Sequence, residues 1–247
     1  MIILFYLVLT IAFIITSTAK YKIHPFLVLI FASLIMGFMG GLEPNVILKT
    51  LSEGFGNTLK SIGIIIAGGS IIGVFLEKTK AAQSIAEKIV KIVGDSNSSL
   101  AMNLTGGIVS IPVFCDSGFV ILSSLNNAIN KKTKISLAIL GTSLAAGLYT
   151  THVFVPPTPG PLAAASILEA NVGLVLLYGL IIAIPVSLVG WFWSIFYCSK
   201  FSIHQETENE IGLKKENNEI PNTYKSILPI IMPILLITTK SIVEHPS

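Results

Sequence analysis

The sequence predicts an all-α polytopic membrane protein with five to six transmembrane helices. Of the 247 residues, 52% are hydrophobic and only 12% are charged, about half the charged fraction of a soluble domain. The mean hydropathy is +0.80, and apolar runs of about 20 residues, the length that crosses a bilayer, recur along the chain. Prolines interrupt two of these stretches, which predicts a re-entrant hairpin and a broken helix. We therefore expect a multi-pass protein of the cell membrane, surrounded by lipid.

The charge pattern and the spacing of the cysteines and histidines exclude several other classes of protein. The net charge of +3 comes from lysines between the apolar runs, as expected for cytoplasmic loops, and does not indicate a nucleic-acid surface. The two cysteines, Cys115 and Cys198, and the four scattered histidines match no disulfide framework and no metal-ligand spacing. We expect no cofactor, no metal site and no nucleic-acid partner.

The first third of the chain predicts three membrane spans. Residues 1–19 are apolar and are followed by two lysines, which fits a first span with its N-terminus outside the cell. A second span is predicted at 25–42 and a third at 58–76. Between them, residues 43–57 contain two glutamates and one lysine and predict a net-acidic outside loop.

Residues 96–130 predict a re-entrant hairpin. A basic amphipathic helix at 77–94 precedes them and a lysine-rich loop follows, so both flanks should be cytoplasmic. These 35 residues are too many for one crossing and too few for two, which need about 20 each plus a turn. Pro112 lies near the middle and Asp116 near the tip, where a carboxylate at bilayer depth indicates a functional group. The alternative is that Asp116 only caps a helix, accepting N–H bonds near Phe119.

Residues 135–168 predict a helix broken at 155–161. Four prolines fall within six positions there, and proline lacks the N–H donor and clashes with the preceding helical turn. Backbone without helical bonds is tolerated at membrane depth only where it is buried in protein or lines a watery cavity. The alternative is an ordinary loop at the membrane surface. The prolines of the predicted break are Pro156, Pro157, Pro159 and Pro161.

The end of the chain predicts the junction between two repeats. Residues 172–199 form a last complete span, which closes an N-terminal membrane repeat at 1–199. The charged, Asn-rich residues 200–224 predict a cytoplasmic linker, and 225–247 predict the first helix of an incomplete second repeat. Five crossings and one hairpin start outside and end inside, so a following copy would be inverted. This pattern predicts one half of an inverted-repeat transporter.

Two motifs and their lead-in resemble a known family. Residues 151–165 read THVFVPPTPGPLAAA, residues 111–122 read IPVFCDSGFVIL, and residues 141–147 read GTSLAAG. Together they resemble the gluconate permease (GntP) family of sugar-acid:proton symporters. The resemblance extends over about residues 60–200.

The resemblance implies proton-coupled uptake of gluconate or of a related sugar acid or small hydroxycarboxylate. Gluconate carriers of the family often have His and Glu where this chain has Thr158 and Asp116, so the resemblance leaves the individual substrate open. Family carriers are much longer than this chain, which therefore resembles an N-terminal half or a truncated fragment. Its partners would be the missing C-terminal half or further copies in a homo-oligomer.

The residues at the two breaks suit a sugar acid. A half-helix that begins at a break presents free N–H groups and the positive end of its dipole to a carboxylate. Hydroxyl side chains suit a polyol, and glycine allows a close backbone approach. Asp116 and His152 are the predicted proton-coupling residues, although His152 could instead be a hydrogen-bonded structural group. The predicted substrate-binding residues are Ser110, Ser117, Gly118, Thr150, Thr151, Thr158 and Gly160.

The residues by themselves leave two other functions open. A sodium-coupled carboxylate carrier or a sodium/proton antiporter would also use a broken helix, whose free carbonyl groups bind Na⁺. An intramembrane enzyme would need a nucleophile–base pair, a metal motif or paired acids, and Asp116 is the only acid in the predicted core, so an enzyme is not expected. The sequence contains no arginine, so a substrate carboxylate must meet backbone dipoles, lysine or another part of the protein.

Overall fold

The computed structural model describes residues 2–203 and 221–243, which are helical apart from turns and short connections and contain no β-strand. Four helical segments are long and apolar enough to cross a membrane, and two shorter apolar helices accompany them. The prediction of an all-α polytopic membrane protein is confirmed. The four long segments are Ile2–Lys20, Pro44–Lys78, Leu137–Ile167 and Val172–Cys198, and the shorter ones are Pro25–Met39 and Thr223–Thr239.

The chain divides into two compact units, Met1–Ser61 and Ile62–Ser247. Unit 1 contains α1 (Ile2–Ile15), the π-helix η1 (Thr16–Lys20), α2 (Pro25–Met39) and the start of α3 (Pro44–Lys78). Helix α2 begins with proline at its first position, where the missing N–H is no loss, and the ring of His24 accepts a hydrogen bond from the Phe26 N–H at 3.3 Å.

The loop predicted at 43–57 is wrong, because residues 44–57 belong to the 35-residue helix α3. Two of the three charged residues that suggested a loop, Lys49 and Glu53, lie instead on the exposed surface of this helix. Lys49 and Glu53 are one helical turn apart with 3.9 Å between Nζ and Oε1, and both side chains are well exposed. Spacing of four residues allows such pairs on a helix surface, so the charges did not require a break.

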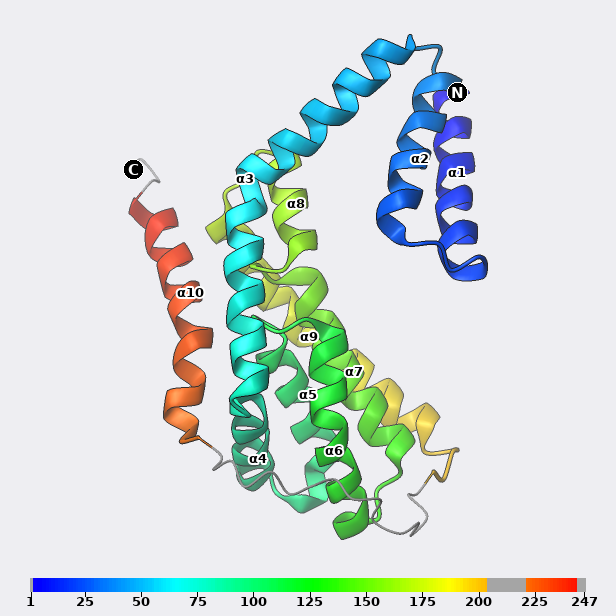
Figure 1. Cartoon of the computed structure of the whole chain (residues 1–247). Helices are drawn as coiled ribbons and strands as arrows, with labels where there is room; N and C mark the ends of the chain where they lie inside the picture. The colour runs from blue at the N-terminus through cyan, green and yellow to red at the C-terminus, as the bar shows by residue number, and fades with distance from the viewer. Residues whose placement is uncertain (1, 204–220, 244–247) are drawn as a thin grey trace. The chain divides into compact units, whose positions relative to one another are not determined.

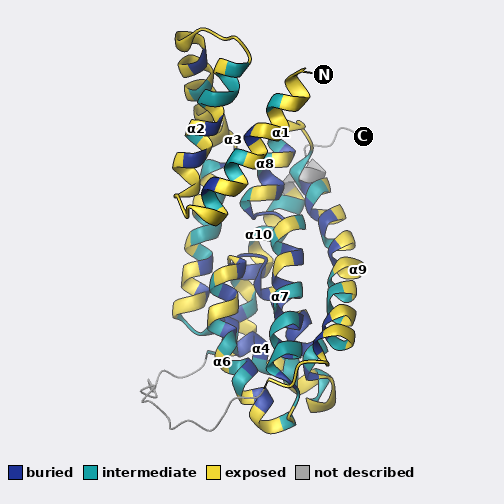
Figure 2. Ribbon diagram, turned by 90° about the vertical axis from the view of Figure 1, so that its right-hand side faces the viewer, coloured by how far each residue is buried: buried dark blue, intermediate teal, exposed yellow. Residues whose placement is uncertain are grey.

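Unit 2 is built around α7, which packs most extensively against α5 and α9 (Figure 1). Buried residues gather on α5 and α7, whereas α9 is largely exposed or half-buried (Figure 2). The C-terminal helix packs on α4 and α9. Besides the end of α3, the elements are α4 (Ala81–Val93), the 3₁₀ turn η2 (Asp95–Asn97), α5 (Ser98–Val109), α6 (Cys115–Thr133), α7 (Leu137–Phe154), α8 (Pro159–Ile167), α9 (Val172–Cys198) and α10 (Thr223–Val243).

Glycines allow the central helices to approach backbone to backbone. A Cβ atom added to Gly147 of α7 would overlap the carbonyl oxygen of Asn103 of α5, and one added to Gly106 would overlap that of Leu144. On the other side, a Cβ on Gly179 of α9 would overlap the carbonyl of Phe154. Small residues permit this close packing in membranes, where van der Waals contact replaces the hydrophobic effect as the force between helices.

A buried asparagine joins the same three helices. The Asn103 side chain is fully buried and its Nδ2 donates to the carbonyls of Ser143 at 3.1 Å and Ser187 at 3.3 Å. The Ser187 hydroxyl donates in return to Asn103 Oδ1 at 2.7 Å. Hydrogen bonds between membrane helices contribute about 1 kcal/mol each, so this network fixes α5, α7 and α9 relative to one another.

Helix α4 is shorter than the predicted 77–94 and only partly follows the predicted apolar face. Ala81–Ala86 is largely buried, with Ile85 2% exposed in the core, but Ile92 is 73% exposed.

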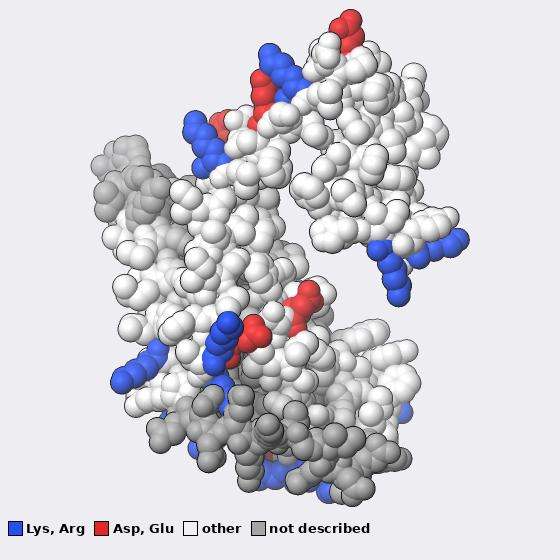
Figure 3. Space-filling model, viewed as in Figure 1, with Lys and Arg blue, Asp and Glu red and all other residues white. Residues whose placement is uncertain are grey.

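Lysines gather toward the lower end of unit 2 in Figure 3, below a broad uncharged surface. The cytoplasmic location of this end stays a prediction. Most of the predicted linker, residues 204–220, lies outside the described residues.

The close approach of α5 and α7 makes a testable prediction. Gly147→Ala should destabilise the protein by about 1–3 kcal/mol, the usual cost of overpacking, because the new methyl group overlaps the Asn103 carbonyl. Gly141→Ala on the same helix is the matched control, since its added methyl would meet only Phe119 Cζ at 3.8 Å. Thermal unfolding of the purified protein in detergent measures both, and equal midpoints for the two variants would contradict the packing.

Candidate functional site

The first break in the helices of unit 2 is the turn between α5 and α6. Helix α5 ends at Val109 and α6 begins at Cys115, so 110–114 connects them. Ser110 is fully buried, and its hydroxyl donates to the Val113 carbonyl at 3.3 Å. The turn therefore satisfies part of its own backbone, as buried backbone must.

The second break separates α7 from α8 and is narrower than the predicted 155–161. Helix α7 ends at Phe154 and α8 begins at Pro159, so only 155–158 is non-helical. Pro159 and Pro161 lie in the first turn of α8, where a missing N–H is tolerated because it would have no helical partner. The Thr158 hydroxyl is buried and donates to the Val155 carbonyl at 2.7 Å.

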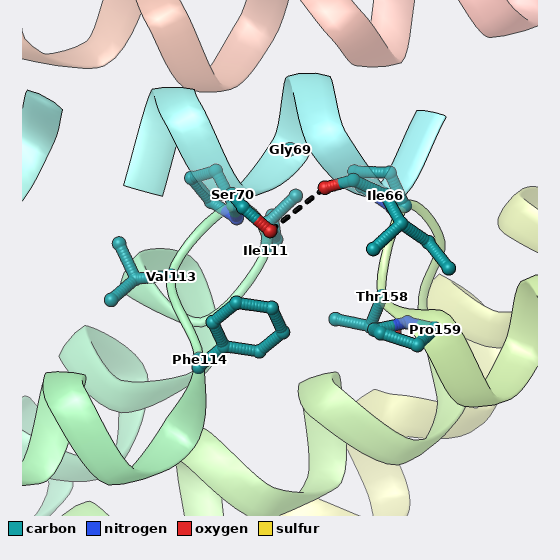
Figure 4. Close-up of a pocket in the computed structure, with 10 residues that line it drawn as sticks. Ile66, Gly69, Ser70, Ile111, Val113, Phe114, Thr158 and Pro159 are labelled. Carbon is teal, nitrogen blue, oxygen red and sulfur yellow. Dashed lines mark hydrogen bonds between the residues drawn. The ribbon is translucent and has the colours of Figure 1, made fainter. Parts of the chain in front are cut away.

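The two breaks meet on one face of α3 (Figure 4). Gly73 touches the first break, since a Cβ added there would lie 2.7 Å from the Pro112 carbonyl oxygen, and Gly69 faces the second, with Pro157 Cγ at 3.7 Å from such an atom. Between them lies a cavity of about 10 Å³, close to the size of one water molecule. Its lining comprises Ile66, Gly69, Ser70, Ile111, Pro112, Val113, Phe114, Pro157, Thr158 and Pro159.

The cavity offers hydrogen-bond acceptors and few donors. Its three prolines have no N–H group. The hydroxyl of Ser70 already donates to the Ile66 carbonyl at 2.8 Å (Figure 4), and that of Thr158 donates to Val155. An anion needs donors, so this cavity is unsuited to a carboxylate and too small for a sugar acid.

The start of α8, where the sequence predicts an anion site, also has few hydrogen-bond donors. Because Pro159 and Pro161 carry no N–H, the first three positions of α8 retain only the donor of Gly160. Gly160 is exposed, and a Cβ added there would meet no atom within 4 Å. The start of α6 is better suited, since Cys115, Asp116 and Ser117 all carry N–H groups in its first turn.

A polar cluster lies where α6 begins and α7 ends. Asp116 is exposed, and its Oδ1 accepts a weak hydrogen bond from Cys115 Sγ at 3.6 Å. The Tyr149 hydroxyl is a further partner of Cys115. The Asp116 carboxylate is near enough to interact electrostatically with His152 of α7. The two predicted proton-coupling residues, which lie far apart in the sequence, are therefore close together in the structure.

His152 has one ring nitrogen without a partner. Its ring meets Phe114 edge-on at 5.9 Å between centroids, and its Nδ1 is buried without a hydrogen-bond partner among the described residues. Asp116 does not form the alternative helix cap, because α6 begins at Cys115 with Phe114 as the N-cap residue and no side-chain cap bond. Asp116 instead lies in the first turn, where the helix dipole favours a negative charge.

Comparison with known proteins identifies the family. The family model described as "GntP family permease" matches residues 2–246. The chain belongs to this family. An uncharacterised permease of Haemophilus influenzae is 38% identical, covering 90% of this chain and 48% of its own length. A gluconate permease of Pseudomonas aeruginosa is 29% identical (95% and 53%), and the D-serine transporter DsdX of Escherichia coli is 32% identical (96% and 54%).

The chain spans about half the length of the curated relatives it matches. No solved structure matches it. Membership of a permease family, together with the apolar helices, establishes a multi-pass protein of the cell membrane.

Most of the other predicted substrate-binding residues are buried within unit 2. Thr150 and Thr151 are 7% and 5% exposed, and the Thr150 hydroxyl donates to the Ala146 carbonyl at 2.7 Å. Gly118 packs against Leu148, and Ser117 is half-buried beside Asp116. Only Ser110, through its turn, and Thr158 belong to the junction of the breaks.

Sequence reasoning missed Ser70 and Tyr149. Ser70 follows Gly69 on α3, and the residues around it contain no signal that the two breaks pack on this face of the helix. Tyr149 lies one helical turn before Val153, and its sequence context is that of an ordinary aromatic residue in an apolar helix. The signal that could have found it is its position three residues before His152 on α7.

The contact between α3 and the hairpin turn can be tested on this chain. Gly73→Ala should push the turn away and expose Cys115, which is 6% exposed, because the added methyl overlaps the Pro112 carbonyl. In a Cys198→Ser background, the rate of maleimide labelling at Cys115 should rise about tenfold. This rise corresponds to a decrease of roughly 1.4 kcal/mol in the free energy needed to expose the thiol. Gly69→Ala is the matched control with ordinary contacts; an unchanged rate in Gly73→Ala would refute the contact.

Proposed function

We propose that this chain forms one half of a proton-coupled permease that takes up a sugar acid or a related small hydroxylated carboxylate. The observation that carries the proposal is the cluster of Asp116 and His152 beside the junction of the two breaks. A carboxylate and an imidazole at membrane depth are costly unless they serve transport. Each of the two groups can accept and release a proton.

The relatives support the substrate class. The names of two of them specify gluconate and D-serine, and both molecules combine a carboxylate with at least one hydroxyl group. In this chain the first turn of α6 offers N–H groups to a carboxylate, and Ser117 and Tyr149 offer hydroxyls nearby. We infer that the substrate binds at the start of α6, outside the one-water cavity.

Sodium coupling is the second candidate, and the cavity at the junction favours it. Carbonyl and hydroxyl oxygens around Pro112, Thr158 and Ser70 act as acceptors, and such unwound backbone binds Na⁺ in other transporters. A cation bound there would lie between the two breaks, so its affinity would depend on how the two breaks are arranged. An enzyme finds no support in the comparisons, which indicate permeases.

Transport assays on a full-length protein test this function. We would fuse this chain to the remaining half of the Haemophilus influenzae permease and measure uptake of labelled gluconate and D-serine in vesicles with an imposed pH gradient. The fusion should accumulate one of them. Asp116→Asn should abolish accumulation, because Asn keeps the shape but cannot exchange a proton, and His152→Gln should reduce it less.

Glu169→Gln is the matched control, since Glu169 is an exposed carboxylate in the turn between α8 and α9 and should leave uptake unchanged. Accumulation by Asp116→Asn that still follows the pH gradient would remove Asp116 from the proton path. Uptake driven by a sodium gradient alone would establish the second candidate. We expect the 247-residue chain alone not to transport.

A further inference from the structure

We propose that the face of unit 2 formed by Asp116 and by the groove between α7 and α9 is the docking surface for the second half of a full-length permease. The inference deepens the proposed function and rests on it, because a substrate at the start of α6 needs groups facing it from another element. We call this surface the docking face.

The docking face has the shape that a membrane helix requires. The groove has a volume of about 510 Å³. Ala145 and Ala146 of α7 and Gly190 of α9 line it with small residues, and Tyr149 and Trp193 contribute aromatic rings. Small residues let a further helix approach closely, which is how helices associate in lipid. Tyr149 also connects the groove to the polar cluster, because its hydroxyl contacts Cys115 next to Asp116.

The charge on the docking face cannot remain in lipid. Asp116 is exposed on this face, and neither of the ion pairs found among the described residues includes it. A carboxylate without a counter-charge is costly to hold against hydrocarbon. What covers this face must therefore bring hydrogen-bond donors or a positive charge to the level of Asp116.

Three available occupants do not meet this requirement. Lipid chains have no donors. The helices α1 and α2 contain no charged residue, and their threonine and serine hydroxyls donate largely to their own helices. A second copy of this chain would place the same carboxylate opposite Asp116. The curated relatives have about as much chain again beyond the matched part, and that second half is the occupant we assign to the docking face.

Photo-crosslinking tests the assignment. The fusion of this chain to the second half of the Haemophilus influenzae permease would carry a protease site at the junction and p-benzoylphenylalanine in place of Val189, in the groove. Ile184 is the matched control position on the same helix. Both residues are exposed, at 68% and 65%, but Ile184 lies about 140° around the helix from Val189.

After illumination and cleavage, the Val189 variant should keep the two halves covalently joined in at least tenfold higher yield than the Ile184 variant. Equal yields, no joining at Val189, or crosslinks from Val189 to α1 or α2 within this chain would each overturn the assignment. The readout needs no transport, so a fusion that crosslinks as expected but takes up no substrate would refute the proposed function and leave the docking face in place.

Discussion

A membrane helix can be interrupted only where something other than lipid satisfies or covers the freed backbone, and the structure of unit 2 depends on how it meets this constraint. The connection between α5 and α6 and the connection between α7 and α8 both interrupt helices. They pack against each other and against the glycine face of α3. Serine and threonine hydroxyls within each break bond to its carbonyls, which reduces the number of groups left without partners.

The position of the breaks follows from the packing of the central helices. Glycines in α5 and α7 bring the two backbones together, and Asn103 ties both helices to α9. Because α5 leads into the first break and α7 into the second, this packing holds the two breaks at the same level. It also places the start of α6 beside the last turn of α7, where Asp116 and His152 interact. Residues that never touch the proposed substrate therefore determine the geometry of the site.

The sequence predicted the fold class and the location of both breaks, because apolar length and proline are strong local signals. It erred where local signals conflict with helical continuity. The charges at 43–57 suggested a loop, but Lys49 and Glu53 lie on the surface of α3. Pro159 and Pro161 were assigned to a break, although they form the first turn of α8. The proximity of Asp116 to His152 and the role of Ser70 could not be predicted, since both depend on the packing of helices distant in sequence.

The central claim is that the proline-rich break packs on α3, and one disulfide tests it directly. A Cβ added to Gly69 would lie 4.0 Å from Pro157 Cβ, within the separation of about 3.5–4.5 Å that a disulfide needs. In a background with Cys115→Ser and Cys198→Ser, the pair Gly69→Cys and Pro157→Cys should oxidise readily and lose reactivity toward maleimide. The pair Gly68→Cys and Pro157→Cys should stay reduced, because a Cβ on Gly68 meets nothing within 4 Å. Equal oxidation of the two pairs, or none in the first, would contradict the account.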